Sequence, residues 1–376
     1  MEEWKEYKLG DVVNILDSKR VPLSSKERST RQGCYPYYGA QGIIDYIDDF
    51  IFDGTYLLIA EDGENLKSQK QNVAQLASGK YWVNNHAHIL ESNGKSDIRY
   101  ICYLLNTLDL SGYITGSAQP KLNQANLIKI AFKLPPLEIQ KDIADYLSVF
   151  DDKIEVNRKT NENLEQQAQA LFKSWFVDFE PFKNGDFVES ELGRIPKGWR
   201  VVELADACTI KYGKGLGKND LTQKGFPVFG GNGIIGFYTQ YLYNLPQILV
   251  SCRGAASGKI IESLPQSYVT SNSLVLELKD RFYYNYLKFF LLSKPLYDYA
   301  TGSAQPQITI DNIKGVKVLL PHQEVIQKMD PILKFIGNTQ RNNEFKSRCL
   351  AELRDTLLPK LMSGELNVFD KPNDQS

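Results

Sequence analysis

The sequence predicts an α+β fold made of two copies of one unit, each a globular part followed by a long helix. Three observations predict it. The hexapeptide Thr-Gly-Ser-Ala-Gln-Pro occurs at Thr115–Pro120 and again at Thr301–Pro306, 301 − 115 = 186 residues later in a chain of 376. Apolar residues after each hexapeptide recur with heptad spacing, and short apolar runs separated by turn residues fill the remainder. A long repeat of this kind indicates duplication.

Other segments of the two copies also correspond. The pairs are Trp4–Val12 with Trp199–Ala207, Tyr38–Ile44 with Phe229–Ile235, and Ile59–Gly63 with Val250–Gly254. Glycines and apolar positions are kept in each pair, whereas the polar residues between them change. This is the pattern expected for one scaffold that carries two different surfaces.

The globular parts are predicted to consist of short strands joined by Gly-rich and Asn-rich turns, with one helix in each part. We expect strands at Tyr56–Ala60, Ala87–Leu90, Gln247–Ser251 and Ser273–Leu278, and helices at Ile98–Asn106 and Phe282–Leu292.

Two long helices are predicted by alternating steps of three and four between apolar positions, which are typical of a coiled-coil seam. Pro135-Pro136 and Pro321 mark their starts and Gly364 the end of the second. The expected seam comprises Ile143, Leu147, Phe150, Ile154, Asn157, Leu164, Leu171, Met329, Leu333, Ile336, Asn343, Leu350 and Leu357, with Asn161, Gln340 and Ser347 as further polar members. We expect an antiparallel pair whose polar centre fixes register. The alternative is that each helix packs only on its own globular part.

These elements predict five segments. They are a first globular domain (1–135), a helix (136–180), a second globular domain (181–321), a second helix (322–366) and a polar tail (367–376).

Composition favours a cytoplasmic protein. No run of about 18 apolar residues exists, and the N-terminus lacks the basic and apolar regions of a signal peptide. The five cysteines are scattered without a Cys-x-x-Cys pair, which favours reduced thiols. The net charge is −1, but residues 184–321 carry 15 basic against 11 acidic residues (+4) and residues 1–135 carry 15 against 16 (−1). A DNA-binding role for this chain would therefore need partner subunits for part of the phosphate contact.

The polar loops have the side-chain chemistry of DNA recognition, because Gln pairs with adenine and Lys or Arg with guanine. Basic residues beside glycines allow close approach of the backbone. The candidate DNA-contact residues are Lys19, Arg20, Tyr38, Gln41, Ser117, Gln119, Lys121, Lys214, Lys218, Asn232, Arg253, Ser303, Gln305 and Gln307.

The sequence does not match three common catalytic motifs. Gly217-Lys218 is followed by Asn219 and lacks the leading glycine of a phosphate-binding loop. The Asn/Asp-Pro-Pro-Tyr/Phe motif of amino-methyltransferases is missing, and Glu277-Leu-Lys279 lacks a nearby preceding Asp for a nuclease site. His86 and His88 could share a strand face, but the sequence offers no third ligand nearby. We therefore predict neither a catalytic residue nor a metal site.

The chain resembles the specificity (S) subunit of type I restriction-modification systems over nearly its whole length. The resemblance is carried by the two hexapeptides, Leu134–Gln140, Leu171–Phe176 continuing to Ile195–Trp199, and Leu357–Leu366. It implies two target recognition domains that read a bipartite duplex, and an antiparallel coiled coil that sets the spacer and docks two modification (M) subunits. S-adenosylmethionine, ATP and Mg²⁺ would belong to the M and restriction (R) subunits, so this chain would hold no cofactor and perform no catalysis.

The sequence therefore predicts a DNA-recognition subunit that does not span a membrane. Two alternatives stay open: a twin-module scaffold that binds proteins rather than DNA, and a stand-alone DNA-modifying enzyme.

Overall fold

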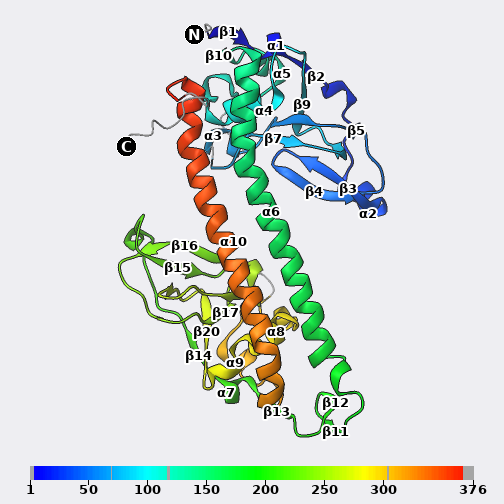
Figure 1. Cartoon of the computed structure of the whole chain (residues 1–376), viewed down its shortest axis with the longest axis vertical. Coiled ribbons are helices and arrows are strands. Elements are labelled where there is room, and N and C mark those ends of the chain that lie inside the picture. The colour runs from blue at the N-terminus through cyan, green and yellow to red at the C-terminus, as the bar shows by residue number, and fades with distance from the viewer. Residues whose placement is uncertain (1–3, 69, 117–118, 303–304, 367–376) are drawn as a thin grey trace, which may run out of the picture. The chain divides into compact units, whose positions relative to one another are not determined.

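The computed structural model describes residues 4–68, 70–116, 119–302 and 305–366. Contacts divide the chain into two units, Met1–Val156 with Phe345–Ser376, and Asn157–Glu344. Each unit holds one globular domain together with half of each long helix. The predicted fold class, two duplicated α+β domains with two long helices, is confirmed (Figure 1).

The first domain contains two main sheets and a short strand pair. Their orders are β2-β9-β6-β7, β4-β3-β8-β5 and β1-β10. The strands are β1 (Lys5–Lys8), β2 (Val13–Ile15), β3 (Gln32–Gly39), β4 (Gly42–Ile47), β5 (Phe52–Asp53), β6 (Tyr56–Ala60), β7 (Ala74–Ala77), β8 (Lys80–Val83), β9 (Ala87–Ser92) and β10 (Ala131–Leu134). The helices are α1 (Leu9–Val12), α2 (Ser25–Thr30), α3 (Asn65–Ser68), α4 (Ile98–Thr107) and α5 (Gln124–Leu127).

The second domain repeats this plan. Its sheet orders are β14-β20-β17-β18, β16-β15-β19 and β13-β21, with an added hairpin β11-β12. The strands are β11 (Phe187–Ser190), β12 (Gly193–Pro196), β13 (Arg200–Glu203), β14 (Cys208–Tyr212), β15 (Phe226–Gly230), β16 (Gly233–Tyr238), β17 (Ile248–Ser251), β18 (Ile260–Glu262), β19 (Tyr268–Val269), β20 (Ser273–Leu278) and β21 (Lys317–Leu320). The helices are α7 (Leu204–Ala207), α8 (Tyr284–Leu292) and α9 (Ile310–Ile313).

The strand pairing shows which residues of the two domains are equivalent. In the first domain Ile59 of β6 pairs with His88 of β9, and in the second Val250 of β17 pairs with Leu274 of β20. Strands β3 and β8 pair in parallel, as do β15 and β19. Equivalent positions in the two domains can therefore be compared directly.

Each domain core is built around one amphipathic helix. Helix α4 begins where the Asp97 carboxylate accepts hydrogen bonds from the amides of Arg99 and Tyr100, which satisfies two otherwise unpaired donors of the first turn. Its buried side chains, including Ile101 and Leu105 at i and i+4, face the sheet. Helix α8 covers the sheet of the second domain with a more continuous apolar surface.

The two long helices are α6 (Leu137–Phe176) and α10 (Gln323–Ser363), and in each unit their segments lie side by side (Figure 1). In the second unit Asn161 Nδ2 donates to the Gln340 carbonyl oxygen at 3.0 Å, and Asn343 Nδ2 donates to Asn161 Oδ1 at 2.9 Å. In the first unit Arg354 pairs with Asp151. Asp151, earlier in α6, pairs with Arg354, and Asn161, later in α6, bonds to Gln340, which lies before Arg354 in α10. The segments of the two helices therefore run antiparallel, as expected.

The predicted seam residues are all buried or half-buried, but they contact more than the partner helix. Ile143 and Leu147 share a core cluster with Leu105 of α4 and Leu361 of α10. Met329 lies in the equivalent cluster of the second unit. The alternative that each helix packs only on its own domain is therefore wrong, because each helix packs on the other helix as well as on its own domain.

None of the helices within the described residues is long and apolar enough to cross a membrane.

Candidate nucleic-acid interface

The same backbone pairing closes the ends of the repeated hexapeptide in both domains. The backbones of Thr115 and Lys121 exchange two hydrogen bonds of 2.8 Å, and those of Thr301 and Gln307 do the same. Gly116 has φ +85°, and a Cβ there would lie 2.3 Å from the carbonyl oxygen of Gln119. Only glycine fits this conformation and this approach. The candidates Ser117 and Ser303 lie outside the described residues.

The glutamine loops present exposed side chains at equivalent places. Gln119 and Gln305 are both exposed. Gly302 adopts φ +95°, close to the value at Gly116, so both loops have a left-handed residue at this position. The neighbours differ, because Lys121 follows Pro120 in the first loop and Gln307 follows Pro306 in the second.

A second segment holds each loop against the sheet. The Pro120 carbonyl accepts a hydrogen bond from the amide of Gly63 at 3.2 Å, and the Pro306 carbonyl accepts one from the amide of Gly254 at 3.0 Å. Arg253 consequently forms an antiparallel bridge with Gln307. Lys121 bridges in the same way to Asp62. The structure thus brings Arg253, Gln305 and Gln307 together in one domain, and Gln119 and Lys121 together in the other.

The hairpin turns β3–β4 and β15–β16 add the third segment at this end of each domain. A Cβ on Gly63 would lie 3.9 Å from Gln41 Nε2, so the turn lies beside the loop. In the second domain Lys259 Nζ donates to Asn232 Oδ1 at 2.6 Å. Lys259 was not among the sequence candidates, and no repeat or motif marks it.

The remaining candidates are placed differently. Lys214 is exposed just after β14, where its amide donates to the Val269 carbonyl. Lys218 is exposed in the short 3₁₀ helix Lys218–Asp220, and Lys19 is exposed in Asp17–Lys19. The ring of Tyr38 lies edge-on to Tyr81, with centroids 5.3 Å apart, and is half-buried. Burial raises the pKa of Tyr38 above its ordinary value.

Arg20 is held inside the first domain rather than presented at its surface. Its guanidinium donates to Glu61 Oε2 at 2.8 Å and to the Ala87 carbonyl at 2.9 Å, and lies 3.3 Å from Asp17 Oδ2. The side chain is 15% exposed. Lys121 Nζ reaches the other oxygen of Glu61 at 3.2 Å, so the ion pairs extend to the end of the glutamine loop.

His88 lies at the centre of this network. Its Nδ1 is 2.5 Å from Asp17 Oδ2, and its Nε2 is 2.7 Å from the Leu122 carbonyl oxygen. A carboxylate and a carbonyl are both acceptors, so each ring nitrogen of His88 faces an oxygen that can accept a hydrogen bond from it. Burial raises the pKa of the Asp17 carboxyl, but hydrogen bonds from His88 and the Ile89 amide, with the charges of His88 and Arg20, outweigh it and hold the pKa below its ordinary value.

Asp17, Glu61 and His88 also place three possible metal ligands within 4.8 Å of one another. Sequence reasoning missed Asp17 and Glu61, which lie 71 and 27 residues from His88 (88 − 17 and 88 − 61). Both imidazole nitrogens already lie within hydrogen-bonding distance of protein oxygens, at Asp17 and Leu122. Arg20 supplies positive charge to both carboxylates, so the donor set fits an ion-pair network better than a metal site.

Acidification should weaken the first unit through this network. The folded-state pKa of Asp17 is depressed, so its contribution is present above its unfolded pKa of about 3.9 and is lost as pH falls through the folded value. Asp17→Asn should cost about 1–3 kcal/mol at neutral pH and remove this part of the acid dependence. Urea unfolding at several pH values measures both. Asp49→Asn, at an exposed pair with Arg31, is the control; an unchanged acid dependence in Asp17→Asn would contradict the assignment.

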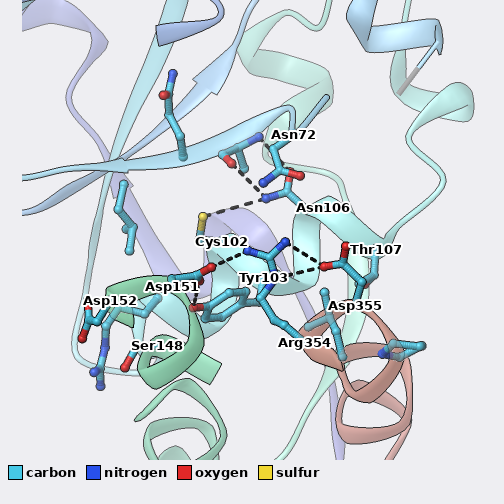
Figure 2. A pocket seen from close by; sticks show the side chains of 16 residues that line it. Asn72, Cys102, Tyr103, Asn106, Thr107, Ser148, Asp151, Asp152, Arg354 and Asp355 are labelled. Atoms are coloured by element: carbon cyan, nitrogen blue, oxygen red, sulfur yellow. Dashed lines mark hydrogen bonds and ion pairs between the residues drawn. The ribbon is translucent and has the colours of Figure 1, made fainter. Parts of the chain in front are cut away.

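A cavity of about 800 Å³, lined by polar and apolar side chains, lies in the first unit, between α4, β7 and the segments of α6 and α10 (Figure 2). Arg354 lies between Asp151 and Asp355, and Tyr103 donates to Asp151. Burial, with the charge of Asp151, raises the pKa of the Cys102 thiol to about 12, so this cysteine is no thiolate nucleophile at neutral pH. The candidate DNA-contact residues do not line this cavity. The cavity instead lies where the segments of α6 and α10 pack on the first domain.

A known protein family matches this chain in two segments, one for each repeat. The family model for the type I restriction modification DNA specificity domain matches residues 1–166 and 196–353. The MjaIX specificity subunit of Methanocaldococcus jannaschii is 32% identical over 299 residues, which cover 72% of this chain and 69% of that relative. The HindI specificity subunit of Haemophilus influenzae is 23% identical, covering 97% of this chain and 100% of the relative.

Among solved structures, the type I restriction-modification S subunit from M. genitalium has a similar fold. Its TM-score is 0.63 at 18% identity, with 96% of each chain covered. Each segment matched by the family model contains most or all of one domain, its hexapeptide and part of a long helix. The chain belongs to the type I restriction-modification DNA specificity family.

Proposed function

We propose that this chain is the DNA-recognition subunit of a type I restriction-modification complex, with each domain reading one half of a bipartite duplex target. One observation carries the proposal. Two loops closed by equivalent backbone pairings present different side chains, with Lys121 beside Asp62 in one and Gln307 beside Arg253 in the other. A shared scaffold with different polar groups suits two half-sites of different sequence.

The charge of the two surfaces supports the same proposal. In the second domain, Arg253 and Lys259 are exposed beside the amide side chains of Gln307 and Asn232, and Lys214 is exposed after β14. Such basic groups contact phosphates and orient the duplex, while the amides discriminate bases. In the first domain Glu61 and Asp62 offset much of the basic charge. A surface of low net charge suits a subunit that shares the duplex with partners.

We further propose that the helix pair sets the spacer between half-sites and docks two methyltransferase subunits. Large apolar side chains are exposed on both helices, among them Val149 (65%), Phe335 (67%) and Phe345 (60%). Exposed apolar groups on an otherwise charged helix favour a further protein contact. S-adenosylmethionine chemistry would reside in those partners, and ATP and Mg²⁺ in restriction subunits. The complex would work in the cytoplasm, where its DNA is.

The glutamine loop supplies the first test. Gln305→Ala should reduce discrimination at one half-site by roughly tenfold to a hundredfold, because a bidentate base contact is worth about 1–3 kcal/mol. Methylation by the chain assembled with methyltransferase subunits is measured on duplexes altered in either half. Gln119→Ala is the matched variant and should affect the other half. Equal loss at both halves in either variant would contradict a separate reader in each domain.

Binding at two salt concentrations separates this proposal from a protein-binding scaffold. Phosphate contact weakens steeply with salt. A full chain with its partners that shows no salt-dependent binding to duplex DNA would favour the scaffold. Methyl transfer by the chain alone would favour a stand-alone enzyme.

A further inference from the structure

Each domain exposes a pair of consecutive isoleucines at the same place. Ile43 and Ile44, the second and third residues of β4, are 45% and 53% exposed. Ile234 and Ile235, the second and third residues of β16, are 42% and 50% exposed. In a strand, side chains normally alternate between the two faces, so one of two neighbours is usually covered. Two exposed apolar neighbours therefore need a structural cause.

The cause is a β-bulge that occurs in both hairpins. The register shifts between Tyr37 and Tyr38 in one hairpin and between Val228 and Phe229 in the other. The extra residue in the second strand is Ile44 or Ile235, and it breaks the alternation.

A glycine opposite each bulge leaves room for the second isoleucine. A Cβ on Gly39 would lie 3.1 Å from Ile44 Cγ2, and a Cβ on Gly230 would lie 2.8 Å from Ile235 Cγ2. Ile44 and Ile235 therefore rest across a backbone without a side chain. Ile43 and Ile234, which precede them, stand beside the turn.

These pairs adjoin the candidate DNA-contact loops. The turn that precedes Ile43 carries Gln41, which lies beside Gly63, and Gly63 in turn binds the glutamine loop. The turn that precedes Ile234 carries Asn232, which binds Lys259. The amide of Ser251 donates to the Lys259 carbonyl at 2.9 Å, which connects this turn to the end of β17.

The isoleucine pairs are the same in the two domains, whereas the polar residues around them differ. Gln41 corresponds to Asn232, Asp62 to Arg253 and Lys121 to Gln307. If the domains read different half-sites, identical apolar pairs cannot account for the difference. A common pair suits a contact that both half-sites provide, which is the deoxyribose and base-edge surface of any duplex.

We propose that Ile43-Ile44 and Ile234-Ile235 are apolar anchors that press against the sugars and base edges of DNA without discriminating sequence. This rests on the proposed function. The charge beside the second pair favours a duplex over a protein as the occupant, because Lys259 and Arg253 are positioned to meet phosphates. Isoleucine is stiff at χ1, so little side-chain entropy is lost when it is covered.

The test uses the full chain assembled with its methyltransferase subunits and two duplexes, one with the target sequence and one with both halves scrambled. The variants are Ile43→Thr/Ile44→Thr and Ile234→Thr/Ile235→Thr, which keep β-branched side chains. Each should lower affinity about tenfold for both duplexes, the scale expected when two half-exposed isoleucines lose apolar burial. The slope of log affinity against log salt should not change, because no phosphate contact is lost.

Matched controls separate the anchors from general effects of the substitution. Val21→Thr in the first domain (Val21 is 45% exposed) and Val188→Thr in the second (39%) should leave affinity unchanged. Lys259→Ala should reduce the salt slope by about one. The single variants Ile43→Thr and Ile234→Thr retain Ile44 or Ile235, which rests on a glycine, so the domain should fold as in the wild type. Their loss of DNA affinity should be smaller than that of the double variants.

Three outcomes overturn the anchors while leaving bipartite recognition intact. The first is unchanged affinity of the double variants. The second is a loss confined to the target duplex, which would make the isoleucines base readers. The third is loss of assembly with the methyltransferase subunits at unchanged DNA affinity of the full chain, which would make the pairs a protein contact. If the wild-type complex has no bipartite preference, the proposed function itself fails.

Discussion

Replacing Gly116 by alanine is expected to abolish discrimination at the half-site read by the first domain and to leave the other half-site unaffected. The new Cβ would lie 2.3 Å from the Gln119 carbonyl oxygen, and φ at this position is +85°. The loop must rearrange to relieve both, which displaces Gln119 and Lys121 together. With two candidate base contacts moved, we expect roughly a hundredfold loss or more of discrimination at that half. Methylation on half-altered duplexes measures it.

A nearby glycine provides the control. Gly112 is exposed, and a Cβ there would meet no atom within 4 Å. Gly112→Ala should therefore behave as wild type. Gly302→Ala should reproduce the defect at the opposite half-site, although with a milder clash, because its Cβ would lie 3.0 Å from the Gln305 carbonyl oxygen. Loss at both halves from Gly116→Ala would show that the loop supports the whole chain rather than one reader.

Phe172→Ala should have the largest effect on stability. Phe172 of α6 is 2% exposed, and its ring centroid lies 4.9 Å from that of Phe176, 5.6 Å from Tyr286 and 6.3 Å from Phe289. These contacts join the helix pair to α8 of the second domain. Truncation of a buried phenylalanine typically costs about 3–5 kcal/mol, through lost burial and the cavity left behind.

Denaturant unfolding checks this prediction. Phe335→Ala, on α10 of the same unit, is the matched control, because that side chain is 67% exposed. It should change the free energy of unfolding by less than about 0.5 kcal/mol. Similar losses in the two variants would mean that α6 is not fastened to the second domain through Phe172.

The duplicated fold was predictable because its signals are local or repeated. Strand β6 and helix α4 follow from short apolar patterns, and α6 and α10 follow from heptad spacing between proline and glycine boundaries. The polar seam residues Asn161, Gln340 and Asn343 were expected to meet, and they do. Spacing alone could not say that the helices also pack on their own domains, since an apolar stripe does not identify its partner.

The candidate site was only partly predictable, because its charges are placed by long-range pairing. Arg20 was selected as a basic group beside a loop, but its partner Glu61 lies 41 residues away and draws the guanidinium inward. Asp17, in the short 3₁₀ helix after β2, meets His88 of β9, a contact that no sequence motif marks. The exposure of Ile43 and Ile44 depends on a bulge, which a regular strand pattern does not reveal.

The most direct test of the central claim is the spacer preferred by a lengthened helix pair. Seven residues of helix-forming sequence would be inserted after Val156 in α6 and after Glu344 in α10, where the two units meet along the chain. Seven residues add about 10.5 Å of helix, or about 3 bp of duplex. The methylated sites of a host that carries this variant with its methyltransferase subunits should keep both half-sites and lengthen the spacer by about 3 bp. An unchanged spacer with unchanged half-sites would contradict two fixed readers separated by a helical ruler.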